Sequence, residues 1–281
     1  MRLIMKKLMT VLISFICWVL AYADCCERDT VTVFMIGDST MADKPIDGDR
    51  QERGWGQMLP GYLTGPVKVE NHARNGRSTK SFIDEGRWLK VVDRIREGDY
   101  VFIQFGHNDE KADSTLHTEA WGSFRDNLCR FVTEARAKGG VPVLFNSIVR
   151  RNYPPRGMKE HRYVYDSEGD SLVDTHGDYV RVPAEVAREL DVPFVDMTAI
   201  SRAIVSGLGP EKSKELYMWI PKGKYRFCPE GKIDNTHFTV YGAQVMASAA
   251  LDALVEVLPS FGRYSRKKVM SSLPEYTRRL E

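Results

Sequence analysis

Short apolar runs alternate with longer stretches of helical periodicity along this chain. The runs are rich in β-branched and aromatic residues, and most are continuously apolar, which is the pattern of strands buried on both faces. They span residues 31–36, 67–71, 100–105, 141–146 and 192–196. Helical periodicity marks residues 55–63, 118–137, 183–190 and 240–258, with a charged stretch at 273–280. This pattern predicts an α/β fold built on a parallel sheet.

Polar residues follow four of the five predicted strands. The polar segments lie at 37–40, 75–78, 106–109 and 147–151. In open parallel sheets, ligands bind at the carboxyl ends of the strands, so we expect the chemistry of the protein at this edge. The last segment opens a stretch of 37 residues, 147–183, without sustained periodicity. Loops of this length in compact domains usually serve a function.

The first 23 residues differ in composition from the rest of the chain. Three basic residues precede an apolar run at 8–20, and Ala-Tyr-Ala follows at 21–23. This arrangement is typical of a secretory signal peptide with its cleavage site. The apolar run is shorter than the ~20 residues that span a bilayer, so we expect an exported protein, secreted or periplasmic, without membrane insertion. Asp24 before Cys25 disfavours a lipid anchor at that cysteine.

Composition and charge narrow the class of protein. With 281 residues, 43% of them hydrophobic, the chain can bury a sizeable core, and we predict one domain at 24–262 followed by a basic helical extension at 263–281. The net charge of +2 becomes −1 without the three basic residues of the predicted signal, which disfavours nucleic acid as a partner. Four cysteines then remain, Cys25, Cys26, Cys129 and Cys228. They allow three full disulfide pairings, and the sequence does not choose among them.

Ser39 is the candidate nucleophile. It follows the first strand and a glycine, a place where a hydroxyl is exposed at the sheet edge, although a helix-capping serine is an alternative. Asp234 and His237 are three residues apart in a polar loop, so a tight turn can point both side chains the same way. The carboxylate would then hold Nδ1 of the imidazole, leaving Nε2 to take the serine proton. A helix-capping aspartate with a structural histidine, or half of a metal site, is the alternative.

Gly76 and Asn108 are candidates for an oxyanion hole. A glycine offers an unhindered backbone N–H, and an asparagine side chain after a strand provides a directed amide donor. Both residues are also common in ordinary turns, which is the alternative interpretation.

In this order, the blocks resemble those of the SGNH (GDSL-type) hydrolases, whose serine, glycine, asparagine and Asp-x-x-His match Ser39, Gly76, Asn108, Asp234 and His237. The resemblance implies a flavodoxin-like three-layer α/β/α sandwich, a five-stranded parallel sheet of order 2-1-3-4-5, and ester hydrolysis without a metal or other cofactor. Longer segments are similar to rhamnogalacturonan acetylesterases, at 37–43, 52–57, 75–78, 99–109, 174–178 and 234–243. They imply a serine esterase that deacetylates pectic polysaccharide. An acetylxylan esterase, a broad small-ester hydrolase and a carbohydrate-binding relic are the alternatives.

A pectic substrate carries galacturonate carboxylates, which arginine binds well because its guanidinium can grip a carboxylate at two points. The candidate contacts lie after the strands or in the long loop: Arg77, His107, Arg150, Arg151 and His176. Solvated arginines and turn-stabilising histidines are the alternatives. For Trp55 and Trp88, which lie in predicted helices, we favour core packing over sugar stacking.

Overall fold

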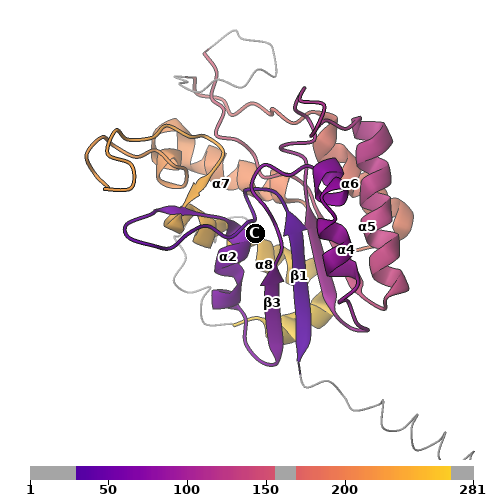
Figure 1. Ribbon diagram of the computed structural model, residues 1–281. Helices are drawn as coiled ribbons and strands as arrows, with labels where there is room; N and C mark the ends of the chain where they lie inside the picture. The colour runs from indigo at the N-terminus through magenta and orange to yellow at the C-terminus, as the bar shows by residue number, and fades with distance from the viewer. Residues whose placement is uncertain (1–29, 156–168, 267–281) are drawn as a thin grey trace, which may run out of the picture.

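The computed structural model describes residues 30–155 and 169–266 (Figure 1). The predicted signal peptide and the predicted helix at 273–280 lie outside these residues, as do Cys25 and Cys26. Five parallel strands form the central sheet in the order β3-β1-β4-β5-β6. They are β1 (Val31–Gly37), β3 (Val67–Asn71), β4 (Tyr100–Gln104), β5 (Val141–Phe145) and β6 (Phe194–Val195). All five predicted strands and their predicted order are confirmed.

The continuous apolar runs arise because successive side chains of a strand enter two different cores. In β1, Val33 and Met35 face one core, whereas Phe34 and Ile36 face the other. β4 is buried at every position and pairs in register with β1, Phe34 opposite Val101. Both faces of the sheet therefore need a covering layer.

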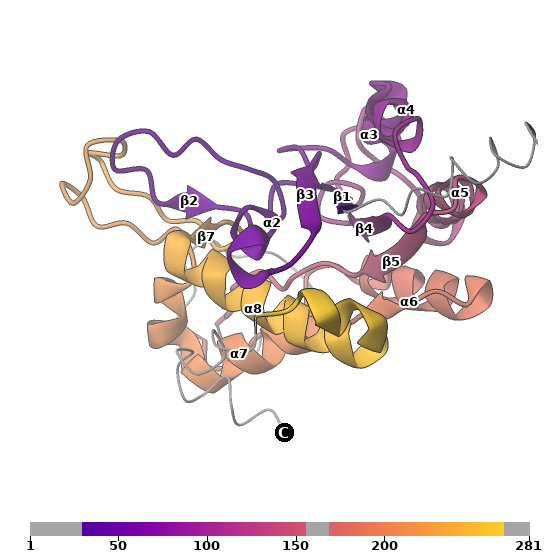
Figure 2. The ribbon, with the colours of Figure 1, turned by 90° about the horizontal axis from the view of Figure 1, so that it is seen from below.

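Helices supply these two layers (Figure 2). One face packs against α2 (Trp55–Met58), α7 (Met197–Lys212) and α8 (Val240–Val257). The other packs against α3 (Thr79–Asp84), α4 (Arg87–Val92), α5 (Arg125–Ala137) and α6 (Asp178–Leu190). The three-layer α/β/α sandwich is thereby confirmed.

Two large aromatic side chains confirm the predicted core packing. Trp55 and Trp88 are each 1% exposed. Both indole N–H groups have hydrogen-bond partners, Trp55 the buried side chain of Gln104 at 2.8 Å and Trp88 the partly exposed carboxylate of Glu134 at 2.5 Å. Of the described helices, α8 is the one long and apolar enough to cross a membrane, and half of it is buried in the core.

The helices differ from the predicted ranges where glycine and proline break the periodicity. The predicted helix at 55–63 is α2 followed by a 3-10 helix, Leu59–Tyr62, which contains Pro60. The predicted helix at 118–137 is a kinked π-helix, Ala120–Phe124, continued by α5. α6 begins five residues earlier than predicted and contains Pro183 within it. α7 was not predicted, since Gly209 and Pro210 interrupt it, and α3 and α4 have only six residues each.

A second, antiparallel pair of short strands was not predicted. β2 (Glu52–Arg53) pairs with β7 (Phe238–Thr239). This pairing brings the long connection after β1 beside the segment that carries Asp234 and His237. It therefore fixes the position of that segment at the edge of the sheet.

Candidate active site

Ser39 lies in a turn directly after β1, at the carboxyl edge of the sheet. Gly37 makes this exit possible, because a Cβ at that position would lie 2.6 Å from the carbonyl oxygen of Gln104. The Ser39 side chain caps no helix: the next described helix is α2, and the hydroxyl is hydrogen-bonded elsewhere. The residue is 8% exposed and borders a cavity.

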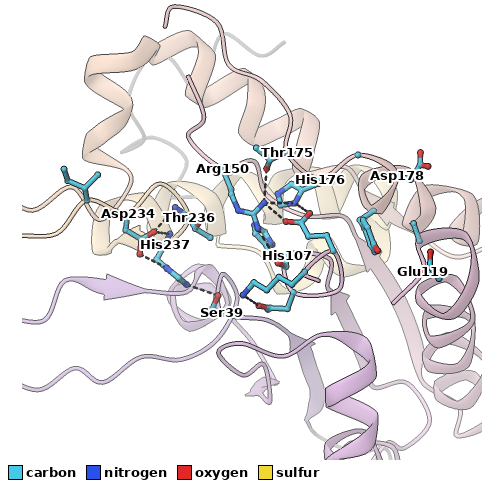
Figure 3. Close-up of a pocket in the computed structure, with 17 residues that line it drawn as sticks. Ser39, His107, Glu119, Arg150, Thr175, His176, Asp178, Asp234, Thr236 and His237 are labelled. Carbon is cyan, nitrogen blue, oxygen red and sulfur yellow. Dashed lines mark hydrogen bonds and ion pairs between the residues drawn. The ribbon is translucent and has the colours of Figure 1, made fainter. Parts of the chain in front are cut away.

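Asp234, His237 and Ser39 form a continuous hydrogen-bonded series (Figure 3). One carboxylate oxygen of Asp234 accepts the backbone N–H groups of Thr236 at 2.8 Å and His237 at 3.0 Å, which closes the predicted tight turn. The other oxygen lies 2.7 Å from Nδ1 of His237. Nε2 of His237 lies 2.9 Å from Oγ of Ser39. The three predicted side chains, 198 residues apart at their extremes, thus meet in the expected order.

The charge state of Asp234 fixes the tautomer of the histidine. Burial alone would raise the pKa of Asp234, but the hydrogen bonds and charge of His237, together with Lys232, hold it well below its usual range. Lys232 Nζ lies 3.0 Å from the same oxygen that meets His237. An ionised carboxylate can only accept, so Nδ1 of His237 carries the proton of that bond, and in the neutral imidazole Nε2 accepts from the Ser39 hydroxyl.

A chain of alternating charges extends from Asp234 toward the turn that carries Gly76. Lys232 also contacts Glu52 at 3.0 Å, and the other oxygen of Glu52 lies 3.1 Å from Nζ of Lys44. Lys44, 6% exposed, donates in turn to the side-chain oxygen of Asn75 at 2.5 Å. These charged residues were not identified as functional from the sequence. Lys232, two residues before Asp234, was the one whose position could have suggested a role.

Asn108 presents its amide at the end of β4 in a fixed orientation. Nδ2 donates to the carbonyl oxygen of Arg77 at 3.0 Å, and Oδ1 accepts from Nζ of Lys111 at 2.7 Å. The two contacts distinguish the ends of the amide and leave one N–H of Nδ2 without a partner among the described residues. Asn108 and Ser39 line the same cavity.

Gly76 lies in the turn after β3 with φ of +73°, a conformation that favours glycine. The backbone N–H groups of Gly76 and Ser39 have no hydrogen-bond partner within residues 30–155 and 169–266. Gly76 itself lines a neighbouring hollow of about 480 Å³ rather than the cavity at Ser39.

The cavity at Ser39 has a volume of about 830 Å³, and most of the residues that line it are polar or charged. Besides Ser39, Asn108, Asp234 and His237, it is lined by three of the predicted substrate contacts, His107, Arg150 and His176. Figure 3 shows these three grouped beside the triad, with Glu119 and Asp178 further along the cavity.

A buried polar network supports that group of three. His107 Nδ1 lies 3.1 Å from Asp38, and the ring of His107 lies 4.5 Å from that of His176. His176 Nδ1 lies 2.7 Å from Glu110, whose other oxygen pairs with Arg150 at 2.5 Å. The guanidinium of Arg150 therefore faces the cavity with its charge already balanced by Glu110.

Burial determines the charge states at His107 and Asp38. Burial lowers the pKa of His107 to about 4, against the attraction of Asp38, so the imidazole is neutral at neutral pH. Burial opposes ionisation of Asp38, yet His107 and the two bonds from Thr40 lower its pKa to about 2. Asp38 is therefore an ionised acceptor that fixes the turn around Ser39.

The structure does not place the other two predicted arginines at the cavity. Arg77 turns into the neighbouring hollow, where its guanidinium binds Glu85 at 2.9 Å. Arg151 is fully buried and donates to Asn235 at 3.1 Å and to Ser213 at 3.1 Å. The partners that hold both guanidinium groups away from the cavity are brought near only by the fold. Arg151, through Asn235, supports the loop that carries Asp234 and does not contact the cavity.

Among the residues described, no cluster of three histidine, cysteine, aspartate or glutamate side chains could hold a metal ion. Cys129 and Cys228 both carry free thiols, so the pairing that joins these two is not formed.

A serine, an imidazole and a carboxylate in hydrogen-bonded series at the carboxyl edge of a parallel α/β sheet are the arrangement of a hydrolase with a serine nucleophile. The comparison with known families specifies which kind. The model of the GDSL-like Lipase/Acylhydrolase family matches residues 35–245, and the chain belongs to this family.

Individual relatives agree with this membership. The chain is 36% identical over 230 residues to the rhamnogalacturonan acetylesterase RhgT of Bacillus subtilis, covering 82% of this chain and 92% of that protein. It is 27% identical to the rhamnogalacturonan acetylesterase of Emericella nidulans, over 80% and 84% of the two chains. The crystal structure of YxiM from Bacillus subtilis shares the fold, with a TM-score of 0.65 and 24% identity over 81% of this chain and 56% of that one.

Proposed function

We propose that this protein is a serine esterase that removes O-acetyl groups from rhamnogalacturonan. The observation that carries the proposal is the Asp234–His237–Ser39 series at a wide cavity lined mainly by polar and charged residues. A relative named rhamnogalacturonan acetylesterase matches over nearly its whole length, which supports the substrate. The charged lining also suits a polysaccharide better than a fatty acyl chain.

In the proposed first step, Oγ of Ser39 attacks the acetyl carbonyl carbon while Nε2 of His237 takes the hydroxyl proton. The carbonyl oxygen becomes an oxyanion that accepts hydrogen bonds from the N–H groups of Ser39 and Gly76 and from Nδ2 of Asn108. When the tetrahedral species collapses, the bond to the sugar oxygen breaks, and that oxygen leaves with the proton from His237. The acetyl group remains on Ser39 as an ester.

The second step regenerates the enzyme. Water attacks the acetyl carbonyl of the ester while His237 takes one of its protons, and the same donors hold the second oxyanion. The bond to Oγ of Ser39 then breaks, Oγ recovers its proton from His237, and acetate departs. Asp234 stays ionised throughout and stabilises the imidazolium that forms in each step.

Acetate release from several substrates tests the proposal. The wild type and Ser39→Ala are incubated with acetylated rhamnogalacturonan, acetylated xylan and 4-nitrophenyl acetate. We expect the wild type to act fastest on rhamnogalacturonan and the variant to release acetate from every substrate at least about 10⁴-fold more slowly. Equal or faster release from xylan would favour an acetylxylan esterase, and activity on the aryl ester alone would favour a broad small-ester hydrolase. No release from any substrate would indicate a binding protein.

We also infer that the enzyme acts outside the cytoplasm, because residues 1–23 have the pattern of a cleavable signal. Expression of the full chain should yield an exported protein whose first residue is Asp24. An unprocessed cytoplasmic product would contradict this inference.

A further inference from the structure

Lys111 is an unpaired cation at the cavity that the sequence analysis did not identify. Two lysine or arginine side chains line the cavity, Lys111 and Arg150. Arg150 is paired with Glu110 at 2.5 Å, whereas no carboxylate of the described residues forms an ion pair with Lys111. Lys111 is exposed, and its Nζ donates to Oδ1 of Asn108 at 2.7 Å.

We propose that Lys111 binds a carboxylate of the substrate and thereby selects acetyl groups carried on or beside an acidic sugar. This inference rests on the proposed function. An ammonium group has three donors, and one of them holds Asn108, so two remain for a carboxylate. Arg77, Arg150 and Arg151 do not compete for this role, because Glu85, Glu110 and buried acceptors occupy their guanidinium groups.

The contact between Lys111 and Asn108 places the carboxylate close to the reacting acetyl group. The same amide that receives Lys111 at Oδ1 presents its remaining N–H on Nδ2 as the proposed oxyanion donor. A carboxylate bound to Lys111 is therefore separated from the acetyl carbonyl only by the side-chain amide of Asn108. This spacing fits an acetyl group on the acidic sugar itself or on its neighbour, and not one several residues along the polysaccharide.

The same contact gives Lys111 a second effect, that of a positioning residue. Without the Lys111 side chain, Oδ1 of Asn108 loses its partner, and the amide is held only by the hydrogen bond from Nδ2 to the carbonyl oxygen of Arg77. The oxyanion donor is then less well oriented, which affects the turnover of every ester. Carboxylate binding affects only charged substrates, so the two effects separate in kcat and KM.

The test compares one acetylated rhamnogalacturonan oligosaccharide in two forms, with free carboxylates and with the carboxylates methyl-esterified. The variants are Lys111→Met, Lys111→Arg, and Lys138→Met, a control at an exposed lysine at the end of α5. In Lys111→Met we expect KM for the free acid to rise roughly 5-fold at low salt, with KM for the methyl ester unchanged. Lys111→Arg should keep the wild-type ratio of the two KM values, and Lys138→Met should behave as the wild type.

On 4-nitrophenyl acetate, which has no carboxylate, Lys111→Met should lower kcat several-fold through the Asn108 amide. A Lys111→Met variant with the wild-type ratio of KM values would overturn the carboxylate assignment. A wild type that deacetylates both forms equally well would overturn it too, while leaving the proposed function intact. A wild type inactive on both forms but active on xylan would overturn the proposed function and this inference together.

Discussion

Asp109, directly after Asn108, is a buried carboxyl group with a half-satisfied side chain. It is 0% exposed. Oδ1 accepts from the backbone N–H of Thr79 at 3.0 Å and from the hydroxyls of Thr79 at 2.5 Å and Thr118 at 3.0 Å, whereas Oδ2 is buried without a hydrogen-bond partner among the described residues. Burial raises the pKa of Asp109 to about 7, although the three hydrogen bonds to Oδ1 oppose the shift.

This shift predicts a stability that falls as the pH rises. Below the unfolded-state pKa of 3.8, both states hold the proton. Between that value and about 7, the folded state keeps a proton that the unfolded state has lost, so the free energy of unfolding decreases with pH. A shift of about three pKa units corresponds to a loss of roughly 4 kcal/mol, complete above the folded-state pKa.

Asp109→Asn removes the titration while keeping an acceptor at the position of Oδ1. Urea unfolding of the variant and the wild type at pH 4.5, 6, 7 and 8.5 measures the difference in unfolding free energy. We expect the variant to gain roughly 3 kcal/mol on the wild type between pH 4.5 and pH 8.5, because the rest of the loss falls below pH 4.5. Other titrating groups, such as His107 and Asp252, are common to both proteins and cancel. Asp93→Asn, at an exposed carboxyl group, should show no such trend. A difference between Asp109→Asn and wild type that does not change with pH would refute the reasoning.

Three predictions concern the reaction. Ser39→Ala should lower kcat by roughly 10⁴- to 10⁶-fold in an acetate-release assay, and adding His237→Ala should change little further because the two act as one unit. Asn108→Ala should cost roughly 10²- to 10³-fold in kcat with a far smaller change in KM; a pure KM effect would instead make Asn108 a substrate contact. Lys232→Met removes a cation 3.0 Å from Asp234. Because a nearby positive charge disfavours the imidazolium of His237, its removal should move the acid limb of the pH–rate profile to higher pH. Lys232→Arg should restore the wild-type limb, and an unmoved limb in Lys232→Met would show that this cation does not influence the histidine.

The strands and the triad were predictable from the sequence because their signals are local. Each continuous apolar run reflects burial on both faces, which the two cores on either side of β1 and β4 explain. Asp234 and His237 are linked by a turn of four residues, and Ser39 follows its strand directly. The helices α3 and α4 were not predicted because their local signal is weak: six residues are too few to establish a helical period.

The roles of the cations were not predictable, because they depend on partners from distant parts of the chain. Arg77 and Arg150 look equivalent in sequence, each following a strand, yet Glu85 draws the first away from the cavity and Glu110 balances the second inside it. Lys111 lies three residues after Asn108, a spacing that brings both side chains together in a tight turn. That spacing was the one local signal of its contact with the amide.

The charged chain from Asn75 to Asp234 explains how two separate loops are held in register at the site. The turn with Gly76 follows β3, whereas Asp234 belongs to a segment outside the main sheet, which pairs with β2 and forms isolated bridges with Tyr217 and Ile220. Glu52, on β2, contacts Lys44 on one side and Lys232 on the other, so a single carboxylate joins both loops. Lys44 is almost fully buried, and a buried charge that loses its partner is strongly destabilising. The lysines and Glu52 therefore must remain together, and this requirement keeps the proposed oxyanion donor of Gly76 at a fixed position relative to the triad.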